Sequence, residues 1–303
     1  MLTHDVKNDL GSTQSGFGPR TILAFVGALT LQVVMIAHAF ASAVVYNDFS
    51  DTSGLVLNGS ATPVNTADGS VLRLTDTMGG FAGSAFTQSK VNASTFSTSF
   101  VFRITDSALS PDGDGIPGGD GLALVVQSAS ADSLGPGGGQ LGYGGIANSM
   151  AVEFDTWRNG GAVAPEDDLN DPSSNHVGIT IAGNPDHGIG SPYTADVTPN
   201  FDDSNIWYAW IDYDGITVDV RANQTGLRPV TPLVSRPLDL STVLGGESSA
   251  FVGFTSGNAD AIGNHYILSW QYLAVPEPSA MVLIASGIAA VVGFSRRRQN
   301  RRR

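Results

Sequence analysis

Two carboxylates stand two residues apart in an otherwise apolar stretch of the chain, Ala151-Val152-Glu153-Phe154-Asp155-Thr156. Side chains of a β-strand alternate between its two faces, so a strand here places Glu153 and Asp155 on one face and the apolar residues on the other. Two neighbouring carboxylates repel each other. The pair therefore requires a shared proton, a cation or open solvent.

Further metal-ligating residue types follow this pair. Asn159 lies just beyond the stretch, and Asp171 and His176 come after a polar loop. Calcium takes six to eight oxygen ligands, and a carboxylate-rich site with one histidine also suits manganese or another divalent transition metal. These residues predict a metal site, with a solvated acidic loop as the alternative. His187 and His265 are weaker metal candidates than His176.

Paired carboxylates on a strand also occur in retaining glycosidases, which hold a nucleophile and an acid about 5 Å apart. The stretch is similar to the Glu-x-Asp-x-Glu signature of family 16 glycoside hydrolases, but Trp157 and Arg158 occupy the positions of the last glutamate. Such a hydrolase would have no proton donor for the leaving group. The sequence also contains no Gly-x-Ser-x-Gly motif and no cysteine. We therefore expect a binding protein with no catalytic residues.

The segments that must position these residues form short β-rich runs, separated by clusters of glycine, asparagine and aspartate. The clearest is a hairpin of residues 206–213 and 216–221 joined by Asp214-Gly215, in which Ile216 and Val220 share the apolar face. This pattern predicts a single all-β domain, a sandwich or jelly roll. Trp210 and Trp270 are expected to pack in its core. Further strands are expected at residues 95–104, 121–127, 150–156, 177–181, 250–255 and 266–272.

The N-terminal segment has the pattern of a secretory signal. An apolar run at residues 21–37 is followed by Ala41-Ser42-Ala43, which fits an h-region and a small-residue cleavage site. We expect residues 1–43 to be a signal peptide that is cut before Val44. An uncleaved membrane anchor is the alternative.

The C-terminal segment combines Val275-Pro276-Glu277-Pro278-Ser279, an apolar stretch at residues 280–294 and an arginine-rich end. Arginines beside a short span favour the cytoplasmic side, which leaves the preceding chain outside. In order and spacing, residues 275–303 resemble the PEP-CTERM sorting signal of Gram-negative bacteria. That resemblance implies a transmembrane segment, processing by an exosortase-type enzyme, and sorting to the cell envelope, the outer surface or an exopolysaccharide matrix.

The net negative charge of the predicted domain limits the kinds of ligand that it can bind. The segment between Val44 and Leu273 contains 7 basic and 25 acidic residues, a formal net charge of −18. Such a surface repels phosphate backbones, so nucleic acid is not expected as a partner, whereas cations and neutral ligands are compatible. The absence of cysteine from the whole chain excludes disulfides, cysteine zinc sites and thiol enzymes.

Taken together, the blocks of the β domain resemble the legume-type (L-type) lectins from about Tyr46 to Tyr272. The resemblance implies a concanavalin A-like jelly roll of two antiparallel sheets spanning residues 44–273, which binds glycan in loops above a calcium and manganese site. The blocks that carry it are residues 119–125, 137–142, 151–159, 175–179, 207–213, 238–241, 252–255 and 265–270.

The resemblance also implies roles for individual residues. It assigns manganese to Glu153, Asp155, Asp171 and His176, and calcium to Asp155, the Trp157 carbonyl, Asn159 and Asp171. Asp167 and Asp168 are alternatives to Asp171, because the intervening loop is longer than in plant lectins. It assigns the sugar to Asp120 after a cis peptide, Gly139, Trp157 and Asn159.

The sequence thus predicts an exported carbohydrate-binding protein whose metal-organised loops bind glycan or exopolysaccharide. A single shallow sugar site binds weakly, so a homo-oligomer that combines several sites is compatible with this function. Two other hypotheses stay open. One is a structural matrix protein that keeps the lectin fold without sugar binding. The other is a glycoside hydrolase.

Overall fold

The computed structural model describes residues 43–112, 117–160 and 168–275 of the 303-residue chain. Almost all of the predicted signal peptide and sorting signal lies outside these residues. Within the described part of the chain, no helix is long and apolar enough to cross a membrane.

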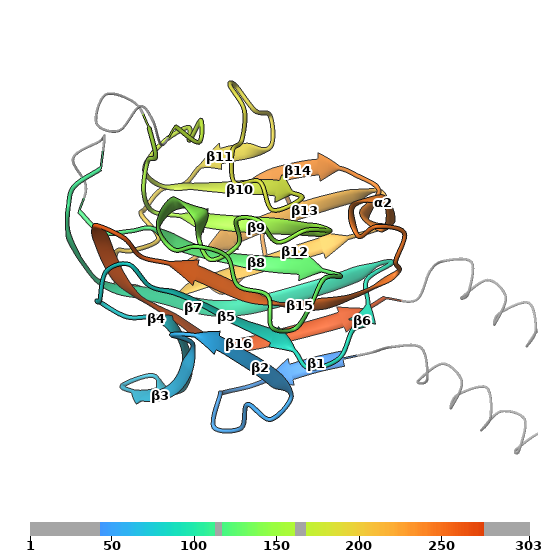
Figure 1. Cartoon of the computed structure of the whole chain (residues 1–303), viewed down its shortest axis with the longest axis horizontal. Coiled ribbons are helices and arrows are strands. Elements are labelled where there is room, and N and C mark those ends of the chain that lie inside the picture. The colour runs from blue at the N-terminus through green and yellow to red at the C-terminus, as the bar shows by residue number, and fades with distance from the viewer. Residues whose placement is uncertain (1–42, 113–116, 161–167, 276–303) are drawn as a thin grey trace, which may run out of the picture. The chain divides into compact units, whose positions relative to one another are not determined.

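Two antiparallel sheets of eight strands each stack face to face (Figure 1), which confirms the predicted all-β sandwich. The first sheet has the order β14 (Val234–Pro237), β13 (Thr217–Asn223), β12 (Trp207–Tyr213), β7 (Phe96–Leu109), β16 (Ala261–Ala274), β4 (Gly69–Thr75) and β3 (Thr62–Thr66), with β1 (Ala43–Tyr46) also paired to β16. The second has the order β11 (Thr194–Asp196), β10 (His176–Ile181), β9 (Ser149–Asp155), β8 (Gly121–Gln127), β15 (Ser249–Gly257), β5 (Ala82–Thr87) and β2 (Leu55–Gly59), with β6 (Val91–Asn92) also paired to β15. Two short helical turns, η1 (Gly138–Gln140) and α2 (Leu240–Val243), lie in the connections.

The core lies between the sheets, and aromatic side chains fill its centre. Phe154 of β9 meets Phe100 of β7 edge to face at a centroid distance of 5.4 Å and meets Phe102 at 5.3 Å. All three rings are buried. Such pairs contribute about 0.5 to 1.5 kcal/mol each beyond the burial of their area. This packing fixes the core face of β9, and with it the position of the residues on the opposite face.

The opposite face of β9 is covered by loops. Tyr143 and Ile146, from the loop between β8 and β9, pack on Ala151 in a second and smaller apolar cluster. The hydroxyl of Tyr143 accepts a hydrogen bond of 3.0 Å from the backbone N–H of Gly183 in the next loop. As a result, all seven residues of β9 are buried, including those that point away from the core.

Every strand expected from the sequence is present, and β7 and β16 extend beyond the expected bounds to 14 residues each. In the predicted hairpin, the Asp214 carboxylate accepts hydrogen bonds from the backbone N–H groups of Ile216 and Thr217. Gly215 takes a φ of +99°, which a residue without a side chain adopts at little cost. The expectation that Ile216 faces the core is wrong, because this residue precedes β13 and is 71% exposed.

The two tryptophans differ in their environment. Trp270 is buried, as predicted. The expectation for Trp210 is wrong, because this residue lies on the outer face of β12, where its ring stacks on Tyr208 at a centroid distance of 6.4 Å. The period of two along β12 gives the inner positions to Trp207, Ala209 and Ile211 instead.

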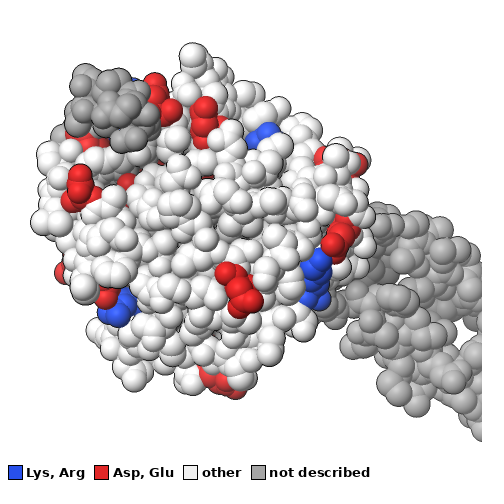
Figure 2. All heavy atoms as spheres, viewed as in Figure 1, with Lys and Arg blue, Asp and Glu red and all other residues white. Residues whose placement is uncertain are grey.

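Charge on the surface is sparse. Figure 2 shows one face on which lysine and arginine side chains stand singly and most of the surface is uncharged. Several of the basic residues are neutralised locally, as where Arg221 contacts Asp212 at 3.0 Å and Asp219 at 3.1 Å. This surface suits an uncharged polar ligand better than a polyanion.

Candidate functional site

The two carboxylates of β9 share one face of the strand, as the sequence predicted. Glu153 is 1% exposed and Asp155 is 2% exposed. Small residues flank Glu153 on both sides, because it pairs with Ala123 of β8 and with Gly178 of β10, whereas Asp155 pairs with Gly121 of β8 and with His176 of β10. The small neighbours leave space above the sheet beside Glu153, and His176 lies beside Asp155.

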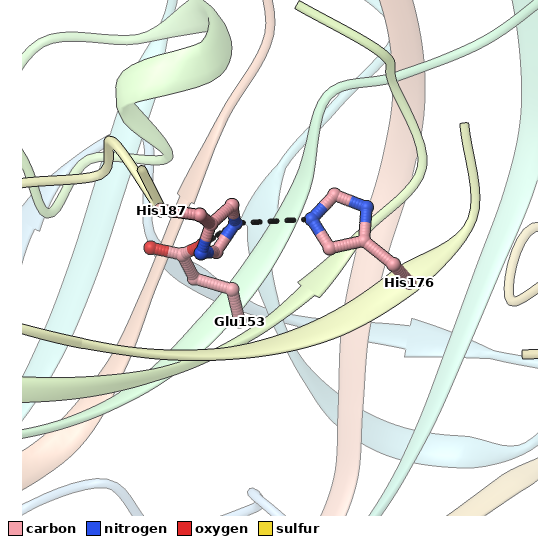
Figure 3. A group of neighbouring side chains, drawn as sticks. All are labelled: Glu153, His176 and His187. Atoms are coloured by element: carbon pink, nitrogen blue, oxygen red, sulfur yellow. Dashed lines mark hydrogen bonds and ion pairs between the residues drawn. The ribbon is translucent and has the colours of Figure 1, made fainter. Parts of the chain in front are cut away.

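Two imidazole rings converge on Glu153. His176, at the start of β10, faces Asp155 across the strand pair, and its Nε2 lies 3.1 Å from Nε2 of His187. The Nε2 of His187 also lies 3.2 Å from Oε2 of Glu153. Figure 3 shows the three side chains pointing toward one another from β9, β10 and the loop after β10. Among the described residues, this is the group of histidine and acidic side chains placed to share a metal ion.

The orientation of His176 is set by a contact on its far side. Its Nδ1 lies 3.0 Å from the carbonyl oxygen of Ser173. A carbonyl only accepts hydrogen bonds, so Nδ1 carries the proton and Nε2 presents a lone pair to the cluster. The opposite side of Glu153 is held by the hydroxyl of Thr180, which donates to Oε1 at 2.8 Å.

Asp171 completes this group from the loop that precedes β10. One of its oxygens, Oδ1, lies 3.7 Å from Nε2 of His187 and 3.9 Å from Nε2 of His176. The other, Oδ2, accepts a hydrogen bond of 2.6 Å from the backbone N–H of Asn159. Asp168, one of the two alternatives to Asp171, is exposed and accepts from the N–H of Asn170. The second alternative, Asp167, lies outside the described residues.

The loop after β9 is tied to the same carboxylates. The backbone N–H of Trp157 donates to Oδ1 of Asp155 at 2.7 Å, and Asn159 is bonded to Asp171 as described above. These contacts bring the Trp157–Asn159 segment next to Asp155 and Asp171, the set to which the resemblance assigns calcium.

The electrostatics of this cluster favour a cation. Burial raises the pKa of Asp155 well above its usual range, and the negative charge of Asp171 raises it further. Burial likewise raises the pKa of Asp171 to about 7, and burial lowers that of His176 to about 3. Burial opposes the charged form of His187, but the hydrogen bond and the charge of Glu153 outweigh it and raise its pKa. Buried carboxyls with raised pKa values gain stability from a divalent cation, which neutralises their charge.

A pocket adjoins this cluster. It has a volume of about 630 Å³, and its lining includes Asp120, Gly139, Trp157 and Asn159. These are the four residues to which the resemblance assigned the sugar, and they come from three separate segments of the chain. The peptide bond between Gly119 and Asp120 is cis, as the resemblance implied.

Two polar atoms of the pocket residues are buried without a hydrogen-bond partner. They are Oδ2 of Asp120 and Oδ1 of Asn159. Buried polar atoms are nearly always paired, so unpaired ones indicate a place for a ligand, an ion or a water molecule. Burial raises the pKa of Asp120 to about 8. The space around Asn159 is narrow, because a Cβ added to Gly139 would lie 2.3 Å from its side-chain amide atoms.

Sequence reasoning ranked His187 below His176, yet the structure places its ring in the cluster. The signal available in the sequence was a second histidine eleven residues after His176 in the same acidic region. His265, the other weak candidate, is buried elsewhere, where its Nδ1 lies 2.7 Å from the hydroxyl of Thr75.

Comparisons with known proteins match the chain to two families. The legume lectin domain matches residues 41–282, and the PEP-CTERM protein-sorting motif matches residues 274–299. Among curated relatives, a probable L-type lectin-domain containing receptor kinase VII.2 of Arabidopsis thaliana is 30% identical over 254 residues, covering 75% of this chain and 34% of the relative. The receptor kinase SIT2 of Oryza sativa subsp. japonica is 29% identical over 256 residues, covering 75% of this chain and 35% of the relative. The chain therefore spans about a third of the length of these relatives.

Solved structures share the fold. A lectin from Bauhinia forficata in complex with GalNAc has a TM-score of 0.61 at 23% identity, with 77% of this chain and 97% of that chain covered. A basic winged bean lectin with Tn-antigen has a TM-score of 0.58 at 25% identity, with 78% and 98% covered. The family match over most of the sequence and the shared jelly roll establish that this chain belongs to the legume lectin domain family and carries a PEP-CTERM sorting motif.

Proposed function

We propose that this protein is an exported lectin that binds glycan in the pocket beside the metal cluster. The observation that carries the proposal is the pocket itself, which gathers Asp120, Gly139, Trp157 and Asn159 next to buried carboxylates. The Asp120 carboxylate accepts hydrogen bonds from sugar hydroxyls, and the Asn159 amide both donates and accepts. The indole of Trp157 offers an apolar face to the carbon side of a pyranose ring.

Two cations fit the donor set beside this pocket. Calcium favours oxygen ligands, and Asp155, the Trp157 carbonyl, Asn159 and Asp171 supply them. A transition metal such as manganese suits carboxylates with one imidazole, and Glu153, Asp155, Asp171 and His176 supply those. In this proposal Asp155 and Asp171 serve both ions.

The metals act on glycan binding through the loop after β9. Trp157 and Asn159 line the pocket, and their backbone N–H groups are bonded to the two carboxylates that serve both ions. A cation bound to Asp155 and Asp171 holds these carboxylates in their charged form and thereby fixes the two sugar-contacting residues. Sugar binding is therefore metal-dependent.

The sorting motif supports an exported location for this binding activity. A signal peptide of residues 1–43 and a sorting segment of residues 275–303 direct export and processing by an exosortase-type enzyme. Several copies on one envelope or matrix surface give avidity to a site that is weak by itself. Glycans or exopolysaccharide of that surface are the ligands in this proposal, and no catalytic step is involved.

A glycan array tests the proposal. The purified full chain is applied with calcium and manganese, with EDTA, as Asp120→Ala, and as the matched control Asp132→Ala, whose side chain is exposed and outside the pocket. We expect binding that disappears with EDTA and with Asp120→Ala but persists in Asp132→Ala. A folded, metal-loaded protein that binds nothing on a broad array would contradict the lectin proposal and favour a structural matrix role.

A further inference from the structure

The position of His187 adds one side chain to the four transition-metal ligands that the resemblance assigned. Its side chain is 1% exposed, and its Nε2 lies within 4 Å of a ligand atom on each of Glu153, His176 and Asp171. We propose that His187 is a further protein ligand of the transition metal, and that it gives the site a preference for ions that favour nitrogen donors, such as Zn²⁺ or Co²⁺, over Mn²⁺. This inference rests on the transition-metal part of the proposed function.

The distances fit coordination of one ion. Two ligand atoms that each lie about 2.1 Å from an ion are separated by about 3.0 Å in an octahedral site and about 3.4 Å in a tetrahedral one. The Nε2 of His187 is 3.1 Å from that of His176 and 3.2 Å from Oε2 of Glu153. Its separation from Oδ1 of Asp171 is 3.7 Å. An ion placed among these four atoms needs only small movements of the side chains.

Hydrogen bonding alone leaves the burial of His187 incompletely explained. Its Nδ1 is buried and has no hydrogen-bond partner among the described residues, although unpaired buried polar atoms are costly. Coordination through Nε2 leaves the proton on Nδ1, so the gain that keeps the ring buried would come from the bond to the cation and from neutralisation of the charges of Glu153 and Asp171.

The strand beneath the ring is shaped to admit it. Gly178 lies two residues after His176 on β10, on the same face, and pairs with Glu153. A Cβ at position 178 would lie 2.2 Å from Cε1 of His187. A side chain at this position would therefore displace the imidazole from the cluster, and glycine is the residue that leaves room for it.

The change in ligand type predicts the change in metal preference. Manganese is a hard ion that suits oxygen ligands, whereas imidazole suits zinc and later transition metals, which also bind a given site more tightly in the Irving–Williams order. A second imidazole therefore favours Zn²⁺ and Co²⁺ more than it favours Mn²⁺. His187 and Thr180 also line a hollow of about 370 Å³ beside the cluster.

Metal competition tests the inference. The full chain is stripped with EDTA, supplied with calcium to fill the oxygen site, and equilibrated with equal concentrations of Mn²⁺ and Zn²⁺. Bound metal is then measured by elemental mass spectrometry. Loss of a partner that merely orients a ligand weakens metal binding about 10- to 100-fold, so His187→Gln should lower the preference for Zn²⁺ at least tenfold.

Two further variants make the test specific. Gly178→Ala should lower the Zn²⁺ preference in the same way while keeping the imidazole in the chain. Asp132→Asn is the matched control, because this exposed carboxylate is not among the residues placed around the ion. It should behave as the unaltered protein. The unfolding temperature of each variant shows that it is folded.

The unaltered protein supplies an independent readout. Loaded with Mn²⁺, it should show couplings to two imidazole nitrogens in pulsed electron paramagnetic resonance, whereas a single coupled imidazole would overturn the inference even if a variant fails to fold. An unchanged preference in folded His187→Gln would also overturn it and leave the proposed lectin function standing. A folded protein that binds no transition metal would contradict the metal site of the proposed function as well.

Discussion

Stability of the metal-free protein should fall as the pH rises from 6.5 to 8. Burial raises the pKa of Asp120 to about 8 and that of Asp171 to about 7, so both hold protons that the unfolded chain, with a carboxyl pKa near 4, has already released. The folded state binds more protons over this interval, and its stability therefore decreases with pH. The raised pKa values of Asp155 and His187 act in the same direction.

The size of the effect follows from proton linkage. Integrated over this interval, Asp120 and Asp171 together lose about 2 kcal/mol of unfolding free energy. Burial lowers the pKa of His176 and of His265 to about 3, so both are neutral in the folded protein over this interval. In the unfolded chain they still bind protons at pH 6.5 and release them as the pH rises, which raises the unfolding free energy by less than half of the amount that the two aspartates remove. The net decrease is about 1 to 2 kcal/mol.

The assay is urea unfolding at pH 6.5, 7.25 and 8, once with EDTA and once with calcium and manganese. Metal binding displaces protons from its ligands and therefore strengthens as pH rises. The metal-loaded protein should accordingly gain stability over the interval in which the metal-free protein loses it. A metal-free protein whose stability rises over this range would refute the inference that the buried carboxyls are protonated when no cation neutralises them.

Three further perturbations follow from the packing. Gly139→Ala should abolish measurable glycan binding in the array, because its Cβ would lie 2.3 Å from the Asn159 amide; Gly263→Ala, whose Cβ meets no atom closer than 3.4 Å, should bind normally, and equal binding by both variants would contradict the pocket assignment. Phe154→Ala should lower the unfolding free energy by about 3 to 5 kcal/mol in urea titrations, whereas exposed Phe81→Ala should change it by less than about 0.5 kcal/mol. Calcium at one hundred times its dissociation constant should stabilise the protein by about 3 kcal/mol, and a calorimetric unfolding temperature unaffected by calcium would argue against the oxygen site.

The sequence predicted the strands well because each one carries a local signal. β8, β9 and β10 are short runs rich in apolar residues, and their bounds agree with the expected ones to within one residue. The facing of Glu153 and Asp155 followed from the period of two. The local sequence pattern could not predict that both side chains are buried. Their burial depends on loops from other parts of the chain that cover this face of β9, such as the loop that carries Tyr143.

The positions of Trp210 and His187 could not be predicted from the local sequence. Trp210 was expected in the core from its residue type, but its register on β12 places it on the outer face. His187 lies in a loop with no periodic pattern, so its spacing from His176 made it a candidate but did not show that its ring would reach Glu153 at 3.2 Å. That contact depends on the absence of a side chain at Gly178 on a different element. Tertiary packing decided both cases.

The surroundings of the two carboxylates of β9 differ from those that a retaining glycosidase needs. A retaining glycosidase needs one carboxylate free to attack the sugar and one protonated group free to donate. Here Glu153 is engaged on both sides, by the Thr180 hydroxyl and by His187, and Asp155 accepts from the backbone of the pocket loop. The pocket itself is lined by Asp120 rather than by this pair. Both carboxylates are thus engaged by neighbouring groups, and Asp155 is tied to the loop that carries Trp157, which supports the proposed role of the pair as metal ligands.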